Sequence, residues 1–592
     1  MIHFSTVSKV IKMLPKRQRI KFISVLFFGV IAALIEVVGV GSVAPFLAVA
    51  SYPETIHKNY LLSKAYNLFS FSSDKNFVIF LGLAVLVFIV TTNSFKAFNR
   101  MVTIRFTSRC RHILATQLMD GYLRQKYVFF LHRGTHEFVK NINGEIQNVF
   151  STVFQPFIEF TASLVQICFF SIFLIYMNPF VSLLVFSGVF FVYLLMYVFL
   201  RNKLKALGLE RYNLNQDRSR ILSEAFWGIK EMKLAGKEHF FSSEYAQPSS
   251  KMTSVESKAE VLSEVPKYAL ETIASAVILL YVMFVVVTVG DLLSVSVTAG
   301  VFVYAGYRLI PATQTMFRSI TKMKFGSAAV DKIIQEFDTV KDSEALSIEP
   351  VKERLKFEKS ITVDNIYYKY PTIDKYVIND VSVKINKNET VGFMGTTGSG
   401  KTTLINIICG LLDPEKGDIL IDGHKLNHEN VRSWQANIGY VPQTIYLSNS
   451  SIAHNIAFGV PIEDIDMQRV IESAKMAQIH DFIDSHYPRA YESSVGERGV
   501  CLSGGQRQRI GIARALYHEP AVLIFDEATS ALDNKTEAEL MAAIENISGK
   551  LTIVMIAHRL STLKNCNNIY HLEGGRITEE GRYKDLVEKK MV

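Results

Sequence analysis

Residues 395–402 read Gly395-Thr396-Thr397-Gly398-Ser399-Gly400-Lys401-Thr402. This G-x-x-x-x-G-K-[ST] spacing is typical of a loop that wraps nucleotide phosphates, because its glycines let backbone N–H groups turn inward. The Lys401 ammonium can then reach the β- and γ-phosphates, and the Thr402 hydroxyl can bind Mg²⁺. Taken alone, the loop indicates only a nucleotide-binding protein, a class that includes kinases, GTPases and motors.

The segments around the loop have the pattern of a parallel α/β domain. Residues 382–394 alternate and then become apolar, as expected for a buried strand that leads into the loop. Residues 403–408 continue the helix whose N-terminus would face the phosphates. A second apolar run, 521–525, ends in Asp526 and Glu527. An Asp-Glu pair is usually a solvated strand end, but downstream of a phosphate loop Asp526 suits the Mg²⁺ shell and Glu527 suits polarising the attacking water.

A second motif stands further along the chain, with the sequence Leu502-Ser503-Gly504-Gly505-Gln506. LSGGQ after a phosphate loop resembles the nucleotide-binding domain of ATP-binding cassette (ABC) proteins. The resemblance covers roughly residues 355–590. It implies an α/β P-loop (RecA-like) ATPase domain with an α-helical subdomain at residues 356–592, using ATP and Mg²⁺.

Other residues match motifs of this family one by one. Gln443 resembles the Q-loop glutamine that touches Mg²⁺ and water, and His558 resembles the switch histidine at the γ-phosphate. Asp533 resembles the D-loop residue. The resemblance therefore implies three catalytic residues, Glu527, His558 and Gln443. The Mg²⁺ ligands that it implies are Thr402, Gln443 and Asp526.

An aromatic residue before the phosphate loop completes the resemblance. Tyr370 matches the side chain that stacks on adenine, and Tyr367 and Tyr368 are close alternatives. The full set implied for nucleotide binding is Tyr370, Gly395, Thr396, Thr397, Gly398, Ser399, Gly400, Lys401, Thr402, Thr403, Leu502, Ser503, Gly504, Gly505, Gln506 and Asp533.

The first half of the chain is strongly apolar. The whole sequence is 49% hydrophobic with a mean hydropathy of +0.20. Long apolar stretches cover residues 22–50, 77–95, 154–176, 180–200, 269–293 and 296–316. Each is near or above the ~20 residues that span a bilayer as a helix, and stretches apolar on every face argue against a soluble bundle.

We therefore expect an all-α transmembrane domain of six helices at residues 21–337. A basic, periodic segment at 1–20 suits an interfacial helix rather than a cleaved signal, and residues 338–355 form the linker to the ATPase domain. This order of spans resembles the exporter-fold (type IV) ABC architecture, whose coupling helices would fall near residues 127–130 and 228–233.

The charge distribution orients the chain. The formal net charge is +9, and its Lys/Arg excess lies in the long loops after the second and fourth spans. The positive-inside rule places these loops, and with them the ATPase domain, in the cytoplasm of a multi-pass membrane protein. Anionic lipid headgroups explain the excess, so we expect a bilayer rather than a nucleic acid as partner.

Ionisable residues within the apolar spans point to the cargo. Glu36, Lys267 and Arg308 are costly at membrane depth, where such groups line a cavity, pair or reach the interface. Residues 35–48 and 59–67, with 307–311, resemble the PglK-type lipid-linked oligosaccharide flippases. In that group inner cations attract the pyrophosphate of a polyprenyl-linked saccharide.

The same resemblance implies an external helix at residues 59–71, whose apolar face would hold Tyr60, Leu61, Tyr66 and Phe69. A helix that merely closes the bundle is the alternative. The sequence departs from the group where Thr92 stands at an expected basic position, with Lys96 one turn further on.

Three classes of function stay open. An ATP-driven flippase of an anionic lipid-linked saccharide is favoured, a general lipid, drug or peptide exporter is the alternative, and a channel regulator is disfavoured because Glu527 is present. In the family that the chain resembles, ATP lies between the phosphate loop of one subunit and the LSGGQ of the other. With one complete set of motifs per chain, the resemblance implies a homodimer with two equivalent ATP sites.

Overall fold

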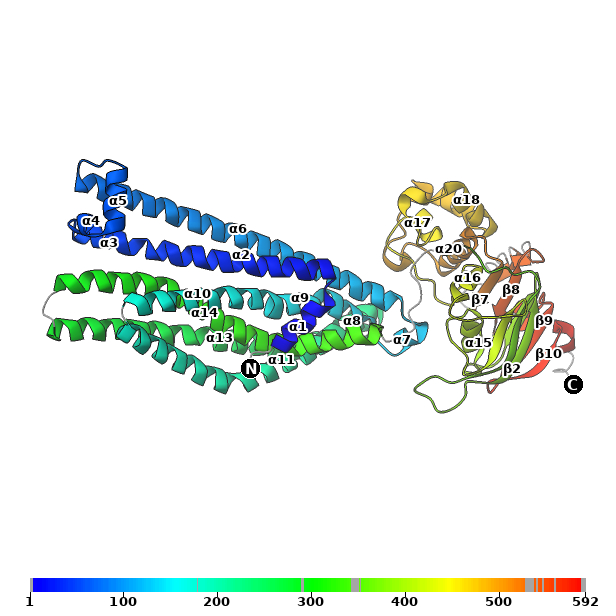
Figure 1. The fold of residues 1–592 in the computed structure, drawn as a ribbon. Coiled ribbons are helices and arrows are strands. Elements are labelled where there is room, and N and C mark those ends of the chain that lie inside the picture. Colours follow the sequence, from blue (N-terminus) through cyan, green and yellow to red (C-terminus); the bar gives the residue numbers. More distant parts are fainter. Residues whose placement is uncertain are drawn as a thin grey trace. The chain divides into compact units, whose positions relative to one another are not determined.

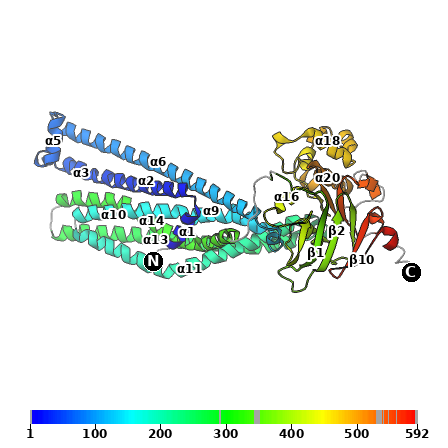
Figure 2. The ribbon, with the colours of Figure 1, turned by 45° about the vertical axis from the view of Figure 1, so that its right-hand side comes forward.

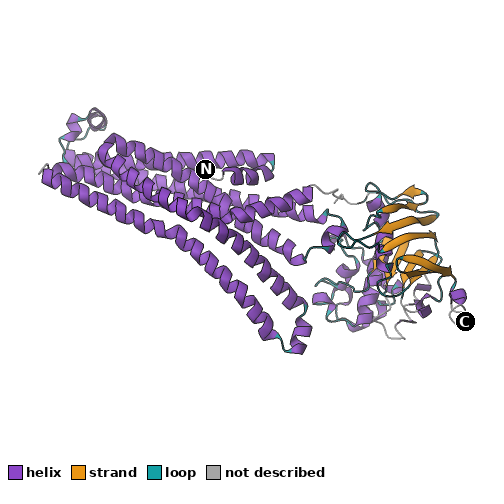
Figure 3. Cartoon of the chain, turned by 90° about the horizontal axis from the view of Figure 1, so that it is seen from below, coloured by secondary structure: helices purple, strands orange, loops and turns teal. Residues whose placement is uncertain are grey.

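The computed structural model describes residues 4–586, apart from 178, 289–291, 342–350, 352, 528–536, 539, 540, 543, 546, 547, 558 and 559. The chain divides into two compact units. The helical unit comprises Met1–Gln125 and Arg133–Ala345, and the α/β unit comprises Lys126–His132 and Leu346–Val592. Figure 3 shows that the described strands belong to the α/β unit.

The helical unit consists of long helices packed side by side with short connections (Figure 1). Its first elements are α1 (Phe4–Met13), α2 (Lys16–Gly41), α3 (Val43–Ser51), α4 (Thr55–Lys58), α5 (Tyr60–Leu68) and α6 (Asp74–Leu123). Next come α8 (Thr135–Val139), the π-helix η1 (Lys140–Glu145), α9 (Ile146–Val149), the π-helix η2 (Phe150–Phe154) and α10 (Gln155–Met177). The last are α11 (Pro179–Trp227), α12 (Ile229–Ala235), α13 (Glu238–Thr288) and α14 (Leu292–Lys341).

Where the structure describes the predicted spans, helices occupy them, but their bounds differ from the apolar stretches. Within the described residues, four helices are long and apolar enough to cross a membrane: Lys16–Gly39, Asp74–Leu123, Thr135–Tyr176 and Phe186–Trp227. The spans predicted at 269–293 and 296–316 coincide with parts of α13 and α14 that flank residues outside the description. Crossing by these two helices stays a prediction.

The beginning of the chain differs in detail from the expectation. The predicted interfacial segment 1–20 divides, because α1 ends at Met13 and α2 already begins at Lys16. The span predicted at 22–50 is interrupted at Ser42, where α3 begins. Pro45 lies in the first turn of α3, a position that tolerates proline because its missing N–H would have no helical partner. Figure 2 shows α3 and α5 at the ends of α2 and α6 far from α9.

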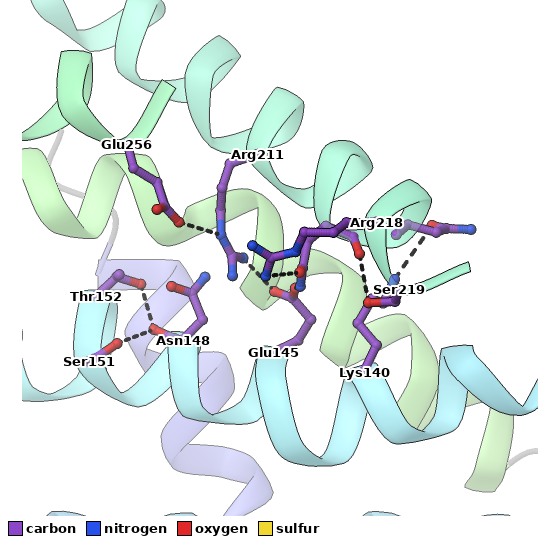
Figure 4. A network of polar contacts seen from close by, with 11 residues as sticks. Lys140, Glu145, Asn148, Ser151, Thr152, Arg211, Arg218, Ser219 and Glu256 are labelled. Atoms are coloured by element: carbon purple, nitrogen blue, oxygen red, sulfur yellow. Dashed lines mark hydrogen bonds and ion pairs between the residues drawn. The ribbon is translucent and has the colours of Figure 1, made fainter. Parts of the chain in front are cut away.

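A buried ion pair joins the helical segments before and after α10. Glu145 is fully buried and accepts hydrogen bonds from Arg211 Nη1 at 2.8 Å and from Asn215 Nδ2 at 2.7 Å, both on α11. Arg211 Nε also lies 3.7 Å from the half-exposed Glu256 of α13. Figure 4 shows Glu145 directed toward Arg211. The pair thus ties η1 to α11 and α13.

The predicted coupling helices are present as short helices. The segment predicted at 127–130 forms α7 (Tyr127–Leu131), which belongs to the α/β unit. Lys126 Nζ lies 3.0 Å from Asp413 Oδ2, and Val128 packs against the hydrophobic core of that unit. The segment predicted at 228–233 forms α12, which carries exposed Leu234.

The α/β unit contains two sheets. A four-stranded antiparallel sheet has the order β2-β1-β4-β5, and a six-stranded sheet has the order β10-β9-β3-β8-β7-β6. The strands are β1 (Ser360–Tyr368), β2 (Ile378–Asn386), β3 (Thr390–Met394), β4 (Lys416–Ile421), β5 (His424–Lys425), β6 (Ile438–Val441), β7 (Val522–Asp526), β8 (Thr552–Ile556), β9 (Asn568–Glu573) and β10 (Arg576–Gly581). Strands β3, β6, β7, β8 and β9 run parallel, and only β10 pairs antiparallel.

The expectation of one strand over residues 382–394 is wrong. The segment holds the end of β2 and all of β3, which lie in different sheets. Asn388 takes a positive φ of 60° between them, a turn conformation that asparagine tolerates. The alternating part therefore belongs to the antiparallel sheet, and only Thr390–Met394, buried throughout, leads into the phosphate loop.

Helices complete the α/β unit. They are α15 (Lys401–Ile408), α16 (Val431–Gln435), α17 (Ile452–Ile456), α18 (Met467–Met476), α19 (His480–His486) and α20 (Gly504–Tyr517). Short 3₁₀ turns are η3 (Ile462–Asp464), η4 (Ala490–Glu492), η5 (Glu497–Gly499) and η6 (Leu560–Leu563). Helices α17 to α20 share a buried apolar cluster, as expected for a helical subdomain.

We expect Glu145→Ala to destabilise the helical unit. The substitution removes the carboxylate from the buried Arg211, a loss that costs up to about 3–5 kcal/mol for a buried pair, less what Glu256 restores. Thermal unfolding in detergent should show a lower melting temperature. Glu256→Ala, at the half-exposed end of the network, should lower the free energy of unfolding by less than about 1 kcal/mol and shift the melting temperature correspondingly less. Equal effects of the two substitutions would contradict this account.

Candidate nucleotide site and membrane ion-pair cluster

The carboxyl ends of four parallel strands gather the predicted nucleotide-site residues. Strand β3 leads into Gly395, β6 into Gln443, and β7 ends at Asp526 just before Glu527. Strand β8 leads toward His558, which lies outside the described residues, as does Asp533. In parallel α/β sheets this edge is where ligands bind.

The phosphate loop has a backbone that requires glycine. Gly400 has a φ of 105°, and a Cβ there would lie 2.9 Å from the Val377 carbonyl oxygen. At Gly395 a Cβ would meet the Leu572 carbonyl oxygen at 2.2 Å. A Cβ at Gly398 would have nothing within 4 Å, so this side of the loop is open.

Donor groups in the loop fit a phosphate ligand. The Ser399 hydroxyl is buried and has no hydrogen-bond partner within the described part of the chain. Lys401 Nζ donates to the carbonyl oxygens of Gly395 at 2.9 Å and Thr396 at 3.0 Å. Burial lowers the pKa of Lys401, while Glu527 and Asp526 oppose that shift. A phosphate would supply these donors with acceptors.

Asp526 and Thr402 form an oxygen pair that suits a divalent cation. Thr402 Oγ1 lies 3.5 Å from Asp526 Oδ1. Burial raises the pKa of Asp526, and Glu527 adds to this, whereas a 2.9 Å hydrogen bond from the Tyr440 hydroxyl opposes it. Carboxylate and hydroxyl oxygens are the ligands that Mg²⁺ takes. Sequence reasoning missed the role of Tyr440, although it belongs to the motif that ends in Gln443.

The predicted base and the Q-loop residue are in direct contact. Gln443 Nε2 donates to Glu527 Oε2 at 2.7 Å. Glu527 has a φ of 52°, a left-handed conformation that is uncommon for a residue other than glycine. Such backbone strain clusters at functional sites because the surrounding structure must impose it. Here the backbone N–H of Glu527 is held by the Ile556 carbonyl.

Tyr370 lies beside the loop helix, as its predicted role requires. Its hydroxyl is 3.1 Å from Thr403 Oγ1, and its ring meets that of Tyr368 edge-on at 5.1 Å. Tyr368 is buried, whereas Tyr367 packs against Tyr376, so Tyr370 is the better candidate of the three to meet a base.

The LSGGQ motif forms a helix start. Ser503 is the N-cap of α20 and accepts from Gln506 N at 3.3 Å, while the Gln506 side chain accepts from Ser503 N at 2.7 Å. This reciprocal capping box leaves the first N–H groups of Gly504 and Gly505 at an electropositive helix end. The S-x-x-Q spacing of Ser503 and Gln506 in the sequence is the signal that indicates such a capping box.

A buried hub connects α20 to the segment after Gln443. Arg514 of α20 donates to the carbonyl oxygens of Asn455 and Tyr446, each at 2.7 Å. Its guanidinium lies 4.7 Å from the Phe458 ring, and burial lowers the pKa of Arg514 to about 10. Asn455, fully buried, also bonds Ser448 through its side chain. These contacts hold α20, which begins in LSGGQ, against the segment that contains Tyr446 and Asn455.

The ionisable residues of the helical unit form a second cluster. Glu36 of α2 is buried and lies 2.6 Å from Lys96 Nζ of α6 and 3.4 Å from Arg308 Nη1 of α14. Arg308 Nε is buried without a hydrogen-bond partner in the described part of the chain. The cluster therefore contains two cations and one acid. Thr92, which stands at the expected basic position, donates its hydroxyl to the Phe88 carbonyl at 2.9 Å, and Lys96, one turn further along α6, is the cation that meets Glu36.

Other predicted membrane residues lie in different contacts. Lys267 pairs with Glu271 at 4.0 Å along α13, and no ion pair joins it to Glu36 within the described residues. The apolar face predicted on α5 is only partly present. Tyr66 packs inward, 5.3 Å from the Phe77 ring, whereas Tyr60 and Phe69 are exposed. The Leu61 side chain lies outside the description.

We expect Tyr440→Phe to move the acid limb of Mg²⁺-dependent nucleotide affinity to higher pH. The hydroxyl stabilises the Asp526 carboxylate, so its loss raises the pKa of Asp526 further. Since a metal needs the ionised carboxylate, binding is lost as pH falls through a higher value. Fluorescent nucleotide titrations from acid to neutral pH would measure the shift. Tyr446→Phe, an exposed tyrosine, should leave the profile in place; an unmoved profile in Tyr440→Phe would contradict the assignment.

Family models match both units. The model described as the ABC transporter transmembrane region matches residues 20–306. The model described as ABC transporter matches residues 378–530, which include the phosphate loop and LSGGQ.

Curated relatives have related names. An "ATP-dependent lipid A-core flippase" of Cupriavidus metallidurans is 32% identical over 394 residues, which are 65% of this chain and 64% of that protein. A protein of the same name from Ralstonia nicotianae is 29% identical over 80% of each chain. The "Alpha-hemolysin translocation ATP-binding protein HlyB" of Escherichia coli O157:H7 is 42% identical over 40% of this chain and 33% of its own length.

A solved structure shares the fold. The ATP-bound structure of a bacterial Atm1-family ABC exporter superposes with a TM-score of 0.75, covering 97% of this chain and 96% of that one at 22% identity. This similarity includes both units. The chain therefore belongs to the ABC transporters: it carries their transmembrane region and their ATPase domain in one polypeptide and shares the fold of an ABC exporter.

Proposed function

We propose that the chain works as a homodimer that uses ATP hydrolysis to move an amphipathic, anionic lipid across a bacterial inner membrane, with the ATPase domain in the cytoplasm. A lipid-linked saccharide is the favoured class of cargo. The observation that carries this proposal is the Glu36–Lys96–Arg308 cluster, because two cations around one buried acid leave positive charge for an anionic headgroup.

Exposed apolar residues support a lipid cargo. Tyr60, Leu68 and Phe69 on and beside α5 are at least half exposed, at 76%, 75% and 56%. Together they offer apolar surface to an acyl or prenyl chain. The names of two relatives, lipid A-core flippases, agree with a glycolipid, whose headgroup carries anionic groups and sugars.

A second candidate is a general lipid, drug or peptide exporter. The relative named as an alpha-hemolysin translocation protein favours it, as does one named "Multidrug resistance protein 1" from Entamoeba histolytica, 41% identical over 39% of this chain. The two candidates differ in which compounds should stimulate the ATPase activity: anionic lipids for the flippase, and also uncharged lipids, drugs or peptides for the general exporter.

The ATPase chemistry follows from the site. Bound Mg²⁺ would neutralise phosphate charge, held by Thr402 and Asp526. Glu527 would accept a proton from the attacking water. Gln443, which donates a hydrogen bond to the Glu527 carboxylate, would orient that carboxylate. Within the described residues no hydrogen bond joins Leu502–Gln506 to the phosphate loop, which agrees with LSGGQ serving the site of a second copy.

We expect Glu527→Gln to bind ATP but hydrolyse it ~10²-fold or more slowly, because an amide cannot accept the proton. With ATP and Mg²⁺ the variant should run at twice the chain mass in detergent. Glu573→Gln, an exposed strand-end change, is the control and should keep normal turnover. A stable, active monomer would rule out the homodimer. Near-normal turnover in Glu527→Gln would show that a group other than Glu527 accepts the proton.

Arg308→Ala tests the cargo. We expect it to abolish stimulation of ATPase activity by a polyprenyl-pyrophosphate-linked saccharide in nanodiscs and to leave basal activity intact. Glu36 keeps Lys96 at 2.6 Å, so the substitution does not leave a buried acid unpaired. Arg308→Lys should rescue partly, since lysine lacks the guanidinium fork.

The control is Arg318→Ala on the same helix, where the guanidinium pairs with the exposed Glu260 and Glu264. It should retain stimulation. If Arg308→Ala instead lowers the melting temperature and leaves stimulation per folded molecule unchanged, Arg308 is structural. Equal stimulation by uncharged lipids or by peptides would favour the general exporter.

A further inference from the structure

A polar cavity of about 620 Å³ lies in the helical unit among α8, η1, α11 and α14. Its lining includes Arg133, Lys140, Tyr212, Gln216, Lys332 and Glu336. All of these positions fall outside the apolar stretches predicted as spans at 154–176, 180–200 and 296–316. Ligand pockets in proteins typically have volumes of about 300–1,000 Å³.

The most unusual group in this lining is Lys140. The residue is only 6% exposed. Its ammonium lies 4.2 Å from the centre of the Tyr212 ring and 3.5 Å from Gln216 Oε1, at the outer limit of a hydrogen bond. Within the described part of the chain no carboxylate forms an ion pair with it. A buried ammonium carries three donors, and leaving them without acceptors is costly.

Two nearby acids, the buried Glu145 and the partly buried Glu336, are already engaged by other cations. Glu145 holds Arg211 at 2.8 Å, as Figure 4 shows beside Lys140. Glu336 Oε2 accepts from Arg133 Nη1 at 2.7 Å and from the Tyr122 hydroxyl at 2.9 Å. Within the described residues, the one acceptor that a hydrogen bond joins to Lys140 is thus Gln216, while the acids Glu137, Glu336 and Asp338 also line the cavity.

The backbone that carries Lys140 is itself unusual. Lys140 begins the π-helix η1, which ends at Glu145. Single π-helical turns are rare and frequently lie at functional sites. Figure 4 shows Lys140 and Glu145 on one segment, both directed toward α11. The turn thus brings one paired acid and one poorly paired cation to the same neighbour.

We propose that this cavity binds a small anion through one phosphate or carboxylate group, with Lys140 as its main charge partner. Charge-assisted hydrogen bonds to such a group would satisfy the ammonium. Glu137 and Asp338, which also line the cavity, disfavour polyanions such as nucleoside triphosphates. The site is separate from the Glu36–Lys96–Arg308 cluster and does not depend on the proposed cargo.

The test uses the full chain in detergent with Lys401→Ala, so that the phosphate loop does not contribute the binding. Inorganic phosphate is titrated by calorimetry, acetate serves as a carboxylate probe, and chloride at equal ionic strength controls for screening. We expect saturable binding of one anion per chain and a melting temperature that rises with its concentration.

Three substitutions in that background decide the outcome. Lys140→Met should weaken binding by about tenfold or more, because the charged partner is lost. Gln216→Glu places a carboxylate next to Lys140, so it should weaken anion binding equally without lowering the melting temperature. Lys258→Met, on the exposed surface of α13, should leave affinity unchanged.

Gln216→Glu decides the question if Lys140→Met fails to fold. Absence of saturable binding of both phosphate and acetate would overturn the proposal. So would unchanged affinity in Gln216→Glu, since the anion would then bind elsewhere. A drop in affinity in Lys258→Met equal to that in Lys140→Met would show a general charge effect and would also refute the site.

Discussion

Parallel strands place their carboxyl ends at one edge of a sheet, and the nucleotide site depends on that constraint. Strands β3, β7 and β8 are buried throughout, because helices cover both faces of a parallel sheet. Polar side chains can therefore appear only where each strand ends. Gly395 follows β3, Gln443 follows β6, and Asp526 and Glu527 lie at the end of β7, so the shared edge brings three separate motifs together.

Burial also sets the electrostatics of that edge. Asp526 is buried enough for its carboxyl pKa to rise, and Tyr440 counteracts this with a hydrogen bond. The neighbouring Glu527 is held by Gln443 and by a left-handed backbone conformation. The carboxylate proposed to bind Mg²⁺ and the carboxylate proposed to accept a proton thus sit side by side with different supports, which would let adjacent residues perform different tasks.

Charged side chains are also buried in the helical unit, where ion pairs stabilise them. Glu36 and Glu145 are both buried acids that hold an arginine. Around Glu145 a second acid, Glu256, balances the charge, and the network joins helices. Around Glu36 the second partner is the cation Lys96, so positive charge remains. This difference separates a structural ion pair from a candidate cargo site, and Lys140 is a third case, a buried cation with weak protein partners.

The apolar helices, the phosphate loop and the Asp526-Glu527 pair could be predicted from the sequence, because spacing and hydropathy are local properties. The family and the assignment of LSGGQ followed from the resemblance of these motifs, in their order along the chain, to ABC proteins. Local patterns did not show that residues 382–394 divide between two sheets, because both halves are equally suited to strands. They also did not reveal the Tyr440–Asp526 hydrogen bond, the Lys96–Glu36–Arg308 cluster or the contacts of buried Lys140 with Tyr212 and Gln216. Each of these contacts joins positions that are far apart in the chain, and only packing decides which charge meets which partner.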